Sequence, residues 1–324
     1  MASLQADVKS AHGKTLAPAL ISALGRAEAE KTTPGTHPDL TEVVADAAYA
    51  AARVPELVAL LEKWGSDHDY SAESGVNPDD GSFDVDPAEA EASQATAVFN
   101  AWLVRVLALT FGDEAAKLGR GGFPTKYTSS AFIRLVNEDP KKLATYDAAT
   151  GESSLWDDLD TTTEESKDER FVRALISGVA VLEKQLGADR DGWRWGRLHT
   201  VRFEALIPLW DITIPSSTDA TFPGGFPRHG DQWVVDASNF SLTQGKDDDL
   251  AVDYGSGPVQ RAVIEVTPDG PIIHNALPGG ASYDNESQHF ADEAELWRRN
   301  QNHLMPYRTD DVVAESDEHT RITP

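Results

Sequence analysis

The sequence predicts an α+β fold, with a mainly helical region over residues 1–187 and an antiparallel β-rich region over residues 188–324. Apolar residues recur at helical spacing through the first region. After Gly187 the spacing changes to short alternating segments separated by Gly and Pro turns. The chain has 324 residues, of which 40% are hydrophobic, and this is enough apolar mass to form a core.

The helical region is expected to begin at once. Apolar spacing from Leu4 predicts a helix that stops at Gly25. The apolar run from Asp39 to Trp64 is expected to be divided by Pro55 into two helices, because proline removes a hydrogen bond inside a helix. Residues 65–87 are rich in Gly, Ser, Asp and Pro and are expected to form a long loop. Three further helices are expected at residues 88–110, 129–137 and 168–186.

The second region is expected to supply strands and one helix. The strand candidates are His199–Phe203, Gln232–Leu242, Gln260–Val266 and Pro271–Leu277, bounded by turns such as Gly224-Gly225. A last helix is expected at Ala291–Asn300.

Charge and cysteine content exclude several classes of function. The chain has 54 Asp and Glu against 28 Lys and Arg, a net charge of −26, whereas nucleic-acid and anionic-membrane binders need a basic face. The acidic residues are dispersed, which favours salt adaptation over a site for a cationic partner; an ordinarily acidic protein is the alternative. The absence of Cys excludes disulfides and thiolate chemistry. No segment reaches the roughly 18 apolar residues of a membrane span, and no signal peptide is visible.

Two groups of residues resemble metal ligands only weakly. A late cluster supplies imidazole and carboxylate side chains, but polar residues at strand ends explain it better: His274, Asp284, His289 and Asp292. The Asp-rich stretch from Asp67 to Asp86 suggests oxygen-ligated calcium, but Ala72 stands where an EF-hand loop needs Gly. A solvated acidic loop is the favoured interpretation.

Ser238, followed by Asn239, is the one serine weighed as a nucleophile. A nucleophilic serine needs a general base and donors for the oxyanion, and the neighbouring residues supply neither. A serine at a strand end is the favoured interpretation.

Five landmarks occur in the order and spacing of one enzyme family. The first is Leu4-Gln5-Ala6-Asp7 with Ser10 and Leu16-Ala17-Pro18, and the second is Leu60-Leu61-Glu62-Lys63-Trp64 with Phe99-Asn100-Ala101-Trp102-Leu103. The third is Trp195-Gly196-Arg197-Leu198-His199 with Arg202-Phe203, and the fourth is Gly230-Asp231-Gln232-Trp233-Val234-Val235. The fifth is Gly257-Pro258-Val259-Gln260-Arg261 with Leu277-Pro278-Gly279-Gly280-Ala281-Ser282, Ser287-Gln288-His289-Phe290, Asp292 and Trp297. Together they resemble the C-terminal part of the β subunit in the penicillin acylase (penicillin amidase) family of N-terminal nucleophile hydrolases.

The resemblance implies an αββα enzyme made from a precursor that cleaves itself. The new N-terminal Ser is the nucleophile and its own α-amino group is the base. The resemblance places this Ser, the oxyanion Asn and the calcium ligands of the family upstream of Met1, so it assigns no catalytic residue and no metal ligand here. Ser3 is no substitute, since it opens a helix. Ala281 stands where the family often has Gln.

Supporting roles are expected for a small set of residues in the last three landmarks: His199, Arg261, Gly279, Gly280, Ser282, His289 and Asp292. The glycines fit a turn whose backbone packs closely against a neighbour. The resemblance also implies an exposed apolar sheet face, which the missing strands of the family sandwich would cover: Val263, Ile264, Val266, Ile272 and Ile273.

Two hypotheses of function follow. In the first, the chain is a segment of an amidohydrolase acting on a small N-acylated compound, such as a β-lactam side chain or an acyl-homoserine lactone, and is inactive without the missing N-terminal part or α subunit. In the second, it is a non-catalytic acidic module that binds a partner or calcium. The resemblance implies a periplasmic or secreted full-length precursor. No cofactor is expected in this chain, and the resemblance allows a calcium ion whose ligands lie upstream of it.

Overall fold

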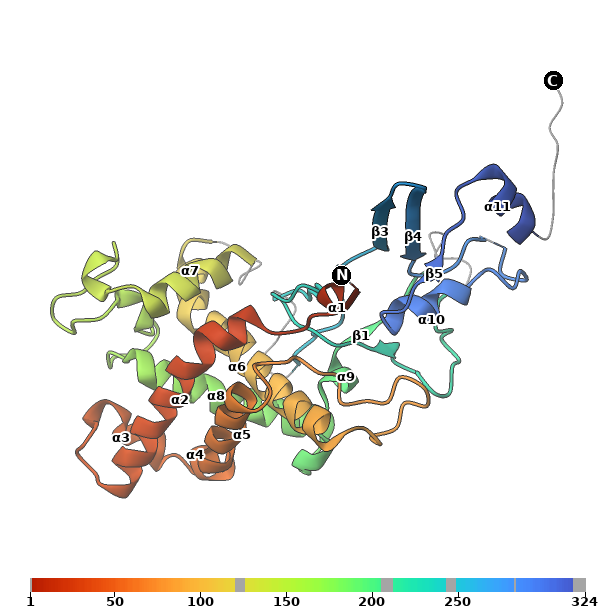
Figure 1. The fold of residues 1–324 in the computed structure, drawn as a ribbon. Coiled ribbons are helices and arrows are strands. Elements are labelled where there is room, and N and C mark those ends of the chain that lie inside the picture. Colours follow the sequence, from red (N-terminus) through yellow and green to blue (C-terminus); the bar gives the residue numbers. More distant parts are fainter. Residues whose placement is uncertain (1, 120–125, 205–211, 243–248, 283, 317–324) are drawn as a thin grey trace. The chain divides into compact units, whose positions relative to one another are not determined.

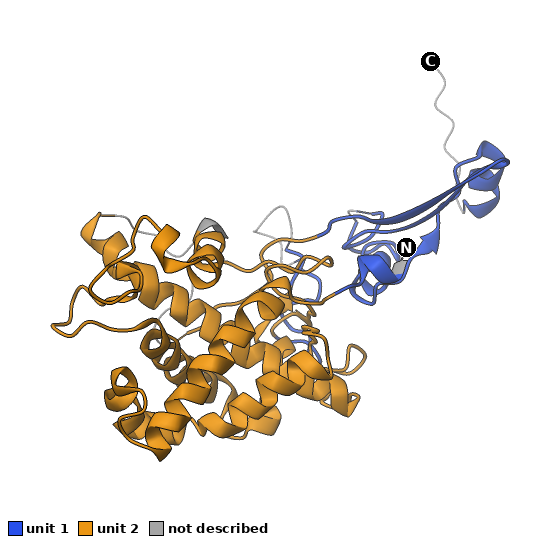
Figure 2. Ribbon diagram, turned by 60° about the vertical axis from the view of Figure 1, so that its left-hand side comes forward, with its two compact units in different colours: residues 1–7, 202–223, 258–324 blue, residues 8–201, 224–257 orange. Residues whose placement is uncertain are grey.

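The computed structural model describes residues 2–119, 126–204, 212–242, 249–282 and 284–316. The chain forms two compact units, coloured separately in Figure 2. The larger unit comprises residues 8–201 and 224–257, and the smaller comprises residues 1–7, 202–223 and 258–324. These units group residues by contact, so the domain limit expected near residue 187 stays a prediction.

The larger unit is built from helices. Their bounds are α2 Ala11–Thr32, α3 Thr41–Ala45, α4 Ala47–Ala51, α5 Val54–Ser66, α6 Pro87–Lys117, α7 Lys126–Asn137, α8 Lys167–Leu186 and α9 Trp195–Leu198, with short 3-10 turns η1 Pro38–Leu40, η2 Pro140–Lys142, η3 Ser154–Trp156 and η4 Arg190–Gly192. Helices α6 and α8 run side by side through the unit (Figure 1). The prediction of a mainly helical first region is confirmed.

Capping side chains set where the helices begin. Asp86 accepts a hydrogen bond from the Ala88 amide at 2.8 Å, with Pro87 in the first turn of α6. Ser166 accepts one from the Glu169 amide at 3.1 Å at the start of α8. The break predicted at Pro55 is confirmed, since Pro55 lies in the first turn of α5. The run nevertheless forms three helices instead of two, because Asp46 caps α4 and separates it from α3.

The prediction for the first helix was wrong at both ends. The structure has a short α1, Ala2–Gln5, in the smaller unit and a separate α2 whose N-cap is Ser10. Helix α2 continues through Gly25 to Thr32. A glycine inside a helix costs about 1 kcal/mol relative to alanine. Full burial of Leu24 and Ala27 on either side offsets this cost.

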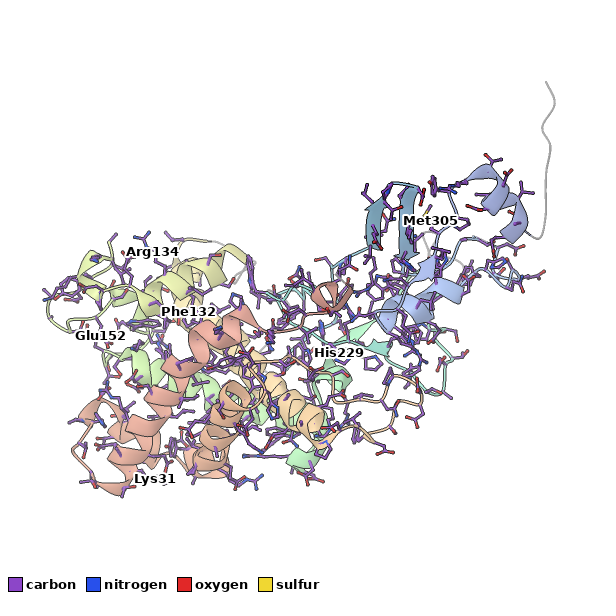
Figure 3. The ribbon with its side chains drawn as sticks, viewed as in Figure 1. Lys31, Phe132, Arg134, Glu152, His229 and Met305 are labelled. Carbon is purple, nitrogen blue, oxygen red and sulfur yellow. The ribbon has the colours of Figure 1, made fainter. Side chains whose placement is uncertain are left out.

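Aromatic rings form the centre of the helical core. Trp102 contacts Phe99, Phe132 and Phe171, with ring centroids 5.6, 6.2 and 5.2 Å apart. Trp156 closes the cluster against Phe171 at 5.8 Å. All five side chains are buried, and Phe132 is labelled in Figure 3. Edge-to-face packing of this kind adds to the stabilisation that burial provides.

Helix α6 is long and apolar enough to cross a membrane by length and composition, contrary to the expectation that no segment reaches that length. Its most apolar window is 83% buried within the protein. The segment is therefore the central core helix of the larger unit.

Only short strands occur in the described part of the larger unit. β1, Thr200–Val201, pairs antiparallel with β2, Phe226–Pro227. The strand predicted at Gln232–Leu242 is wrong: the segment turns back on itself and has one isolated bridge, from Asn239 to Ser256. Its polar groups explain the turn, because the Gln232 amide donates to the backbone oxygen of Phe240.

The smaller unit holds a three-stranded antiparallel sheet in the order β3-β4-β5. The strands are β3 Arg261–Thr267, β4 Gly270–Ala276 and β5 His303–Leu304, and the helices are α1, α10 Asp292–Arg298 and α11 Thr309–Glu315. The antiparallel arrangement predicted for the second region is confirmed.

Of the five apolar side chains predicted to be exposed on this sheet, Ile264, Val266 and Ile272 are exposed, whereas Val263 and Ile273 are half-buried. The five also lie on two faces. Ile264 is 58% and Val266 87% exposed, and both share a face with Ile273, because Ile264 pairs with Ile273. Ile272 pairs with Glu265, so it lies on the opposite face, as does Val263. The more apolar face is therefore a strip along Ile264, Val266 and Ile273.

Candidate functional site

The Gly279–Ser282 turn makes the close backbone approach expected of its glycines. Gly279 has a φ of +142°, a conformation that side chains disfavour. A Cβ atom on Gly280 would lie 2.1 Å from the backbone oxygen of His289. The Ser282 amide donates to the same oxygen at 3.0 Å. The turn is thus held against the segment that leads into α10.

Gly280→Ala is expected to destabilise the smaller unit by about 1–3 kcal/mol, because the added methyl group cannot fit against His289 without moving the backbone. Urea unfolding of the purified variant measures this. Gly224→Ala is the matched control, since its Cβ would meet nothing within 4 Å. Equal effects of the two substitutions would contradict the structural role of Gly280.

Of the four residues weighed as a late metal cluster, the structure joins two. Nδ1 of His289 lies 2.8 Å from Oδ2 of Asp292, three residues further along the chain, and both side chains are exposed. Oδ1 of Asp284 instead accepts a hydrogen bond from the Glu286 amide at 3.0 Å. An exposed pair of this kind contributes little to stability.

Arg261 and His199 are both buried. The Arg261 guanidinium lies 4.9 Å from the ring centroid of Trp297, which attaches α10 to β3. His199 stacks on Trp195 at 4.9 Å, and its Nδ1 donates to the backbone oxygen of Val252 at 2.6 Å. Burial lowers the pKa of His199 to about 3, so the imidazole is neutral. The contacts of both residues hold structure in place.

Ser238 is fully buried, and its hydroxyl donates to the backbone oxygen of Asp236 at 3.2 Å. Beside it, Asp236 accepts a hydrogen bond from Arg228 at 2.6 Å in an ion pair that is itself buried. An enclosed hydroxyl bonded to a backbone oxygen is not placed to attack a substrate.

Four of the five landmarks meet in one buried cluster of the larger unit. Asp231 is fully buried and accepts hydrogen bonds from the Ser10 hydroxyl and the Asn100 side chain. Trp195 donates from Nε1 to the backbone oxygen of Gly230 at 2.7 Å. Burial raises the pKa of Asp231 against the effect of these bonds. Residues more than 200 positions apart are thereby joined around one carboxyl group.

A second cluster was not predicted from the sequence. Ligand atoms of Glu73, Glu89 and His229 all lie within 4.8 Å of one another, and the three side chains are half-buried. Among the described residues this is the one group of three or more His, Asp or Glu with such spacing. It includes none of the six Asp residues between 67 and 86 that were weighed as calcium ligands. All six of these Asp residues are exposed.

The charges in this second cluster influence one another. Burial acts to raise the pKa of Glu73, but the bond to His229 and its charge outweigh burial and lower that pKa. Burial raises the pKa of Glu89, and the charge of Glu73 raises it further, against the effect of His229. His229, which is labelled in Figure 3, thus acts to lower the pKa of both carboxyl groups.

Comparison with known proteins gives the family. The family model described as penicillin amidase matches residues 1–314. The chain belongs to the penicillin amidase family. The resemblance seen in the five landmarks is therefore confirmed.

The relatives of this penicillin amidase family member are much longer than the chain. It is 25% identical over 186 residues to the acyl-homoserine lactone acylase QuiP of Pseudomonas aeruginosa, covering 55% of this chain and 21% of the relative. It is 32% identical over 158 residues to the QuiP of Pseudomonas fluorescens, covering 46% of this chain and 18% of the relative. The chain thus spans about a fifth of the length of these relatives.

Among solved structures, the chain is similar to a thermostable penicillin G acylase from Alcaligenes faecalis. The sequence identity is 16% and the TM-score 0.41, with 98% of this chain and 47% of that chain covered.

Proposed function

We propose that this chain is the C-terminal segment of a penicillin acylase-like amidohydrolase that cleaves the amide bond of a small N-acylated compound. The observation that carries the proposal is the family match over residues 1–314. The names of the longer relatives favour acyl-homoserine lactones as substrates, and the family's own name favours the side-chain amide of a β-lactam.

In this proposal the chain supplies scaffold. The cluster around Asp231 holds α2, α6 and the Gly230 segment together, and the Gly279–Ser282 turn supports the sheet of the smaller unit. The nucleophilic serine, its α-amino base and the oxyanion donors come from the remaining part of the enzyme, which is the partner. Exposure of Ile264 and Val266 supports this partner, because its strands would cover them. The chemistry needs no cofactor, and any calcium is held by that remaining part.

The purified chain alone is expected not to hydrolyse N-phenylacetyl amides or acyl-homoserine lactones. Without a nucleophile, base and oxyanion donors, almost none of the rate enhancement should remain. Release of the free amine or homoserine lactone measures turnover. The same assay is run on the chain co-expressed with any region encoded in frame upstream, where activity is expected.

Ser238→Ala is the decisive control. Steady turnover by the chain alone that disappears in Ser238→Ala would overturn the proposal and make Ser238 the nucleophile. Silence in both preparations, with a stable complex to another protein, would instead favour a non-catalytic binding module.

A further inference from the structure

The second cluster joins three segments of the larger unit. Glu73 lies in the coil after α5, Glu89 in the first turn of α6, and His229 two residues after β2. Nδ1 of His229 lies 3.0 Å from Oε2 of Glu73, although the two residues are 156 positions apart. Three ligand atoms of N and O type therefore converge from separate parts of the chain.

The contacts of His229 give Nδ1 two neighbours with opposite requirements. The Ser74 amide donates to Nδ1 at 3.2 Å, which requires a lone pair on that nitrogen. Oε2 of Glu73, 3.0 Å away, requires a proton there instead. Neither tautomer satisfies both neighbours. A cation bound to the Nδ1 lone pair and to both carboxylates would remove the conflict with Glu73, and the Ser74 amide would then lose Nδ1 as its acceptor.

Hydrogen bonds from neighbouring groups orient the carboxylates of Glu73 and Glu89. The Ser71 hydroxyl donates to Oε1 of Glu73, which leaves Oε2 directed at His229. The Gly75 amide donates to Oε1 of Glu89 at 3.2 Å. Metal-binding carboxylates are commonly held by such outer hydrogen bonds, which fix their direction and contribute to affinity.

We propose that Glu73, Glu89 and His229 bind a divalent transition-metal ion of the Zn²⁺ class, which ties the coil after α5, the start of α6 and the segment after β2 together. Two carboxylates balance the charge of the ion, and a mixed imidazole and carboxylate set suits Zn²⁺ better than Ca²⁺, which prefers oxygen alone. Zn²⁺ binds such atoms at about 2.0–2.2 Å, so atoms within 4.8 Å of one another need only small side-chain rotations. Half-burial leaves a position for water.

Isothermal titration of the full 324-residue chain, freed of metal with a chelator, with Zn²⁺ tests the proposal. One ion per chain is expected to bind, with Ca²⁺ at equal concentration failing to compete. Glu73→Gln and His229→Asn are each expected to weaken binding by at least about tenfold. Thermal melting supplies a second readout, because an ion bound only to the folded state raises the melting temperature of the wild type and not of these variants.

His68→Asn is the matched control. His68 and Glu91 form another pair of imidazole and carboxylate, 2.9 Å apart, that also joins the coil after α5 to α6. The Zn²⁺ affinity of the His68→Asn variant is expected to equal that of the wild type. If the wild type binds no Zn²⁺ saturably, the cluster is a proton-sharing network only and the proposal is wrong. It is equally wrong if His68→Asn loses as much affinity as His229→Asn. If His229→Asn fails to fold, Co²⁺ replaces Zn²⁺ as the probe. Absorption bands of bound Co²⁺ are then expected in the folded wild type and not in Glu73→Gln.

Discussion

Asp236→Ala is expected to lower the free energy of unfolding by about 3–5 kcal/mol. Asp236 and Arg228 are 0% and 1% exposed, and their ion pair is 2.6 Å long. Removal of the carboxylate leaves a guanidinium enclosed by protein without its closest counter-charge. The desolvation of such a charge outweighs anything the smaller side chain gains. Urea unfolding followed by tryptophan fluorescence measures the loss.

Two comparisons isolate the effect of burial. Glu138→Ala breaks the exposed ion pair with Arg134, and its unfolding curve should be nearly unchanged. The double variant Arg228→Met with Asp236→Leu removes both charges, so it should lose less stability than Asp236→Ala alone. If Asp236→Ala is no more harmful than Glu138→Ala, the pair is not a significant part of the core.

Helices were predictable where period and caps agree. The run from Phe171 to Leu182 keeps helical spacing, and Ser166 and Gly187 close its ends in α8. The helix end predicted at Gly25 was wrong, because burial of the neighbouring side chains outweighs the low helix propensity of one glycine. The strand predicted over Gln232–Leu242 was wrong, because the residue pattern does not reveal side-chain hydrogen bonds such as that from Gln232 to Phe240, which bend the segment.

Of the two clusters in the larger unit, the sequence indicates one and not the other. The residues around Asp231 belong to the family landmarks, which the order of residues along the chain is enough to identify. Glu73, Glu89 and His229 were missed. Glu73 and Glu89 lie among many acidic residues of one loop and helix start, and only folding brings His229 to them from 156 positions away. A local spacing rule has no signal for such a cluster.

Stability is expected to fall as the pH drops from about 6.5 towards 4 because of two buried histidines. Burial lowers the pKa of His12 to about 4 and that of His199 to about 3, from an ordinary value of 6.5. Below pH 6.5 these two histidines bind protons in the unfolded chain but stay neutral in the folded chain. Each histidine therefore removes about 1.4 kcal/mol per pH unit in this range. Glu114 acts oppositely: burial and its bond to Asp113 raise its pKa to about 7, so its contribution is lost as the pH rises.

His12→Phe separates these contributions. Neither ring nitrogen of His12 has a hydrogen-bond partner among the described residues, and the ring packs edge-on against Trp233 at 5.6 Å. Phenylalanine keeps that shape, so the variant should match the wild type at pH 7 to within about 1 kcal/mol. Between pH 6.5 and 4 it should lose stability less steeply, by about 1.4 kcal/mol per pH unit. Glu114→Gln should lose it more steeply than the wild type, because the opposing carboxyl is gone. Urea unfolding at four pH values provides the slopes, and a His12→Phe slope equal to that of the wild type would show that the buried imidazole takes up its proton without unfolding.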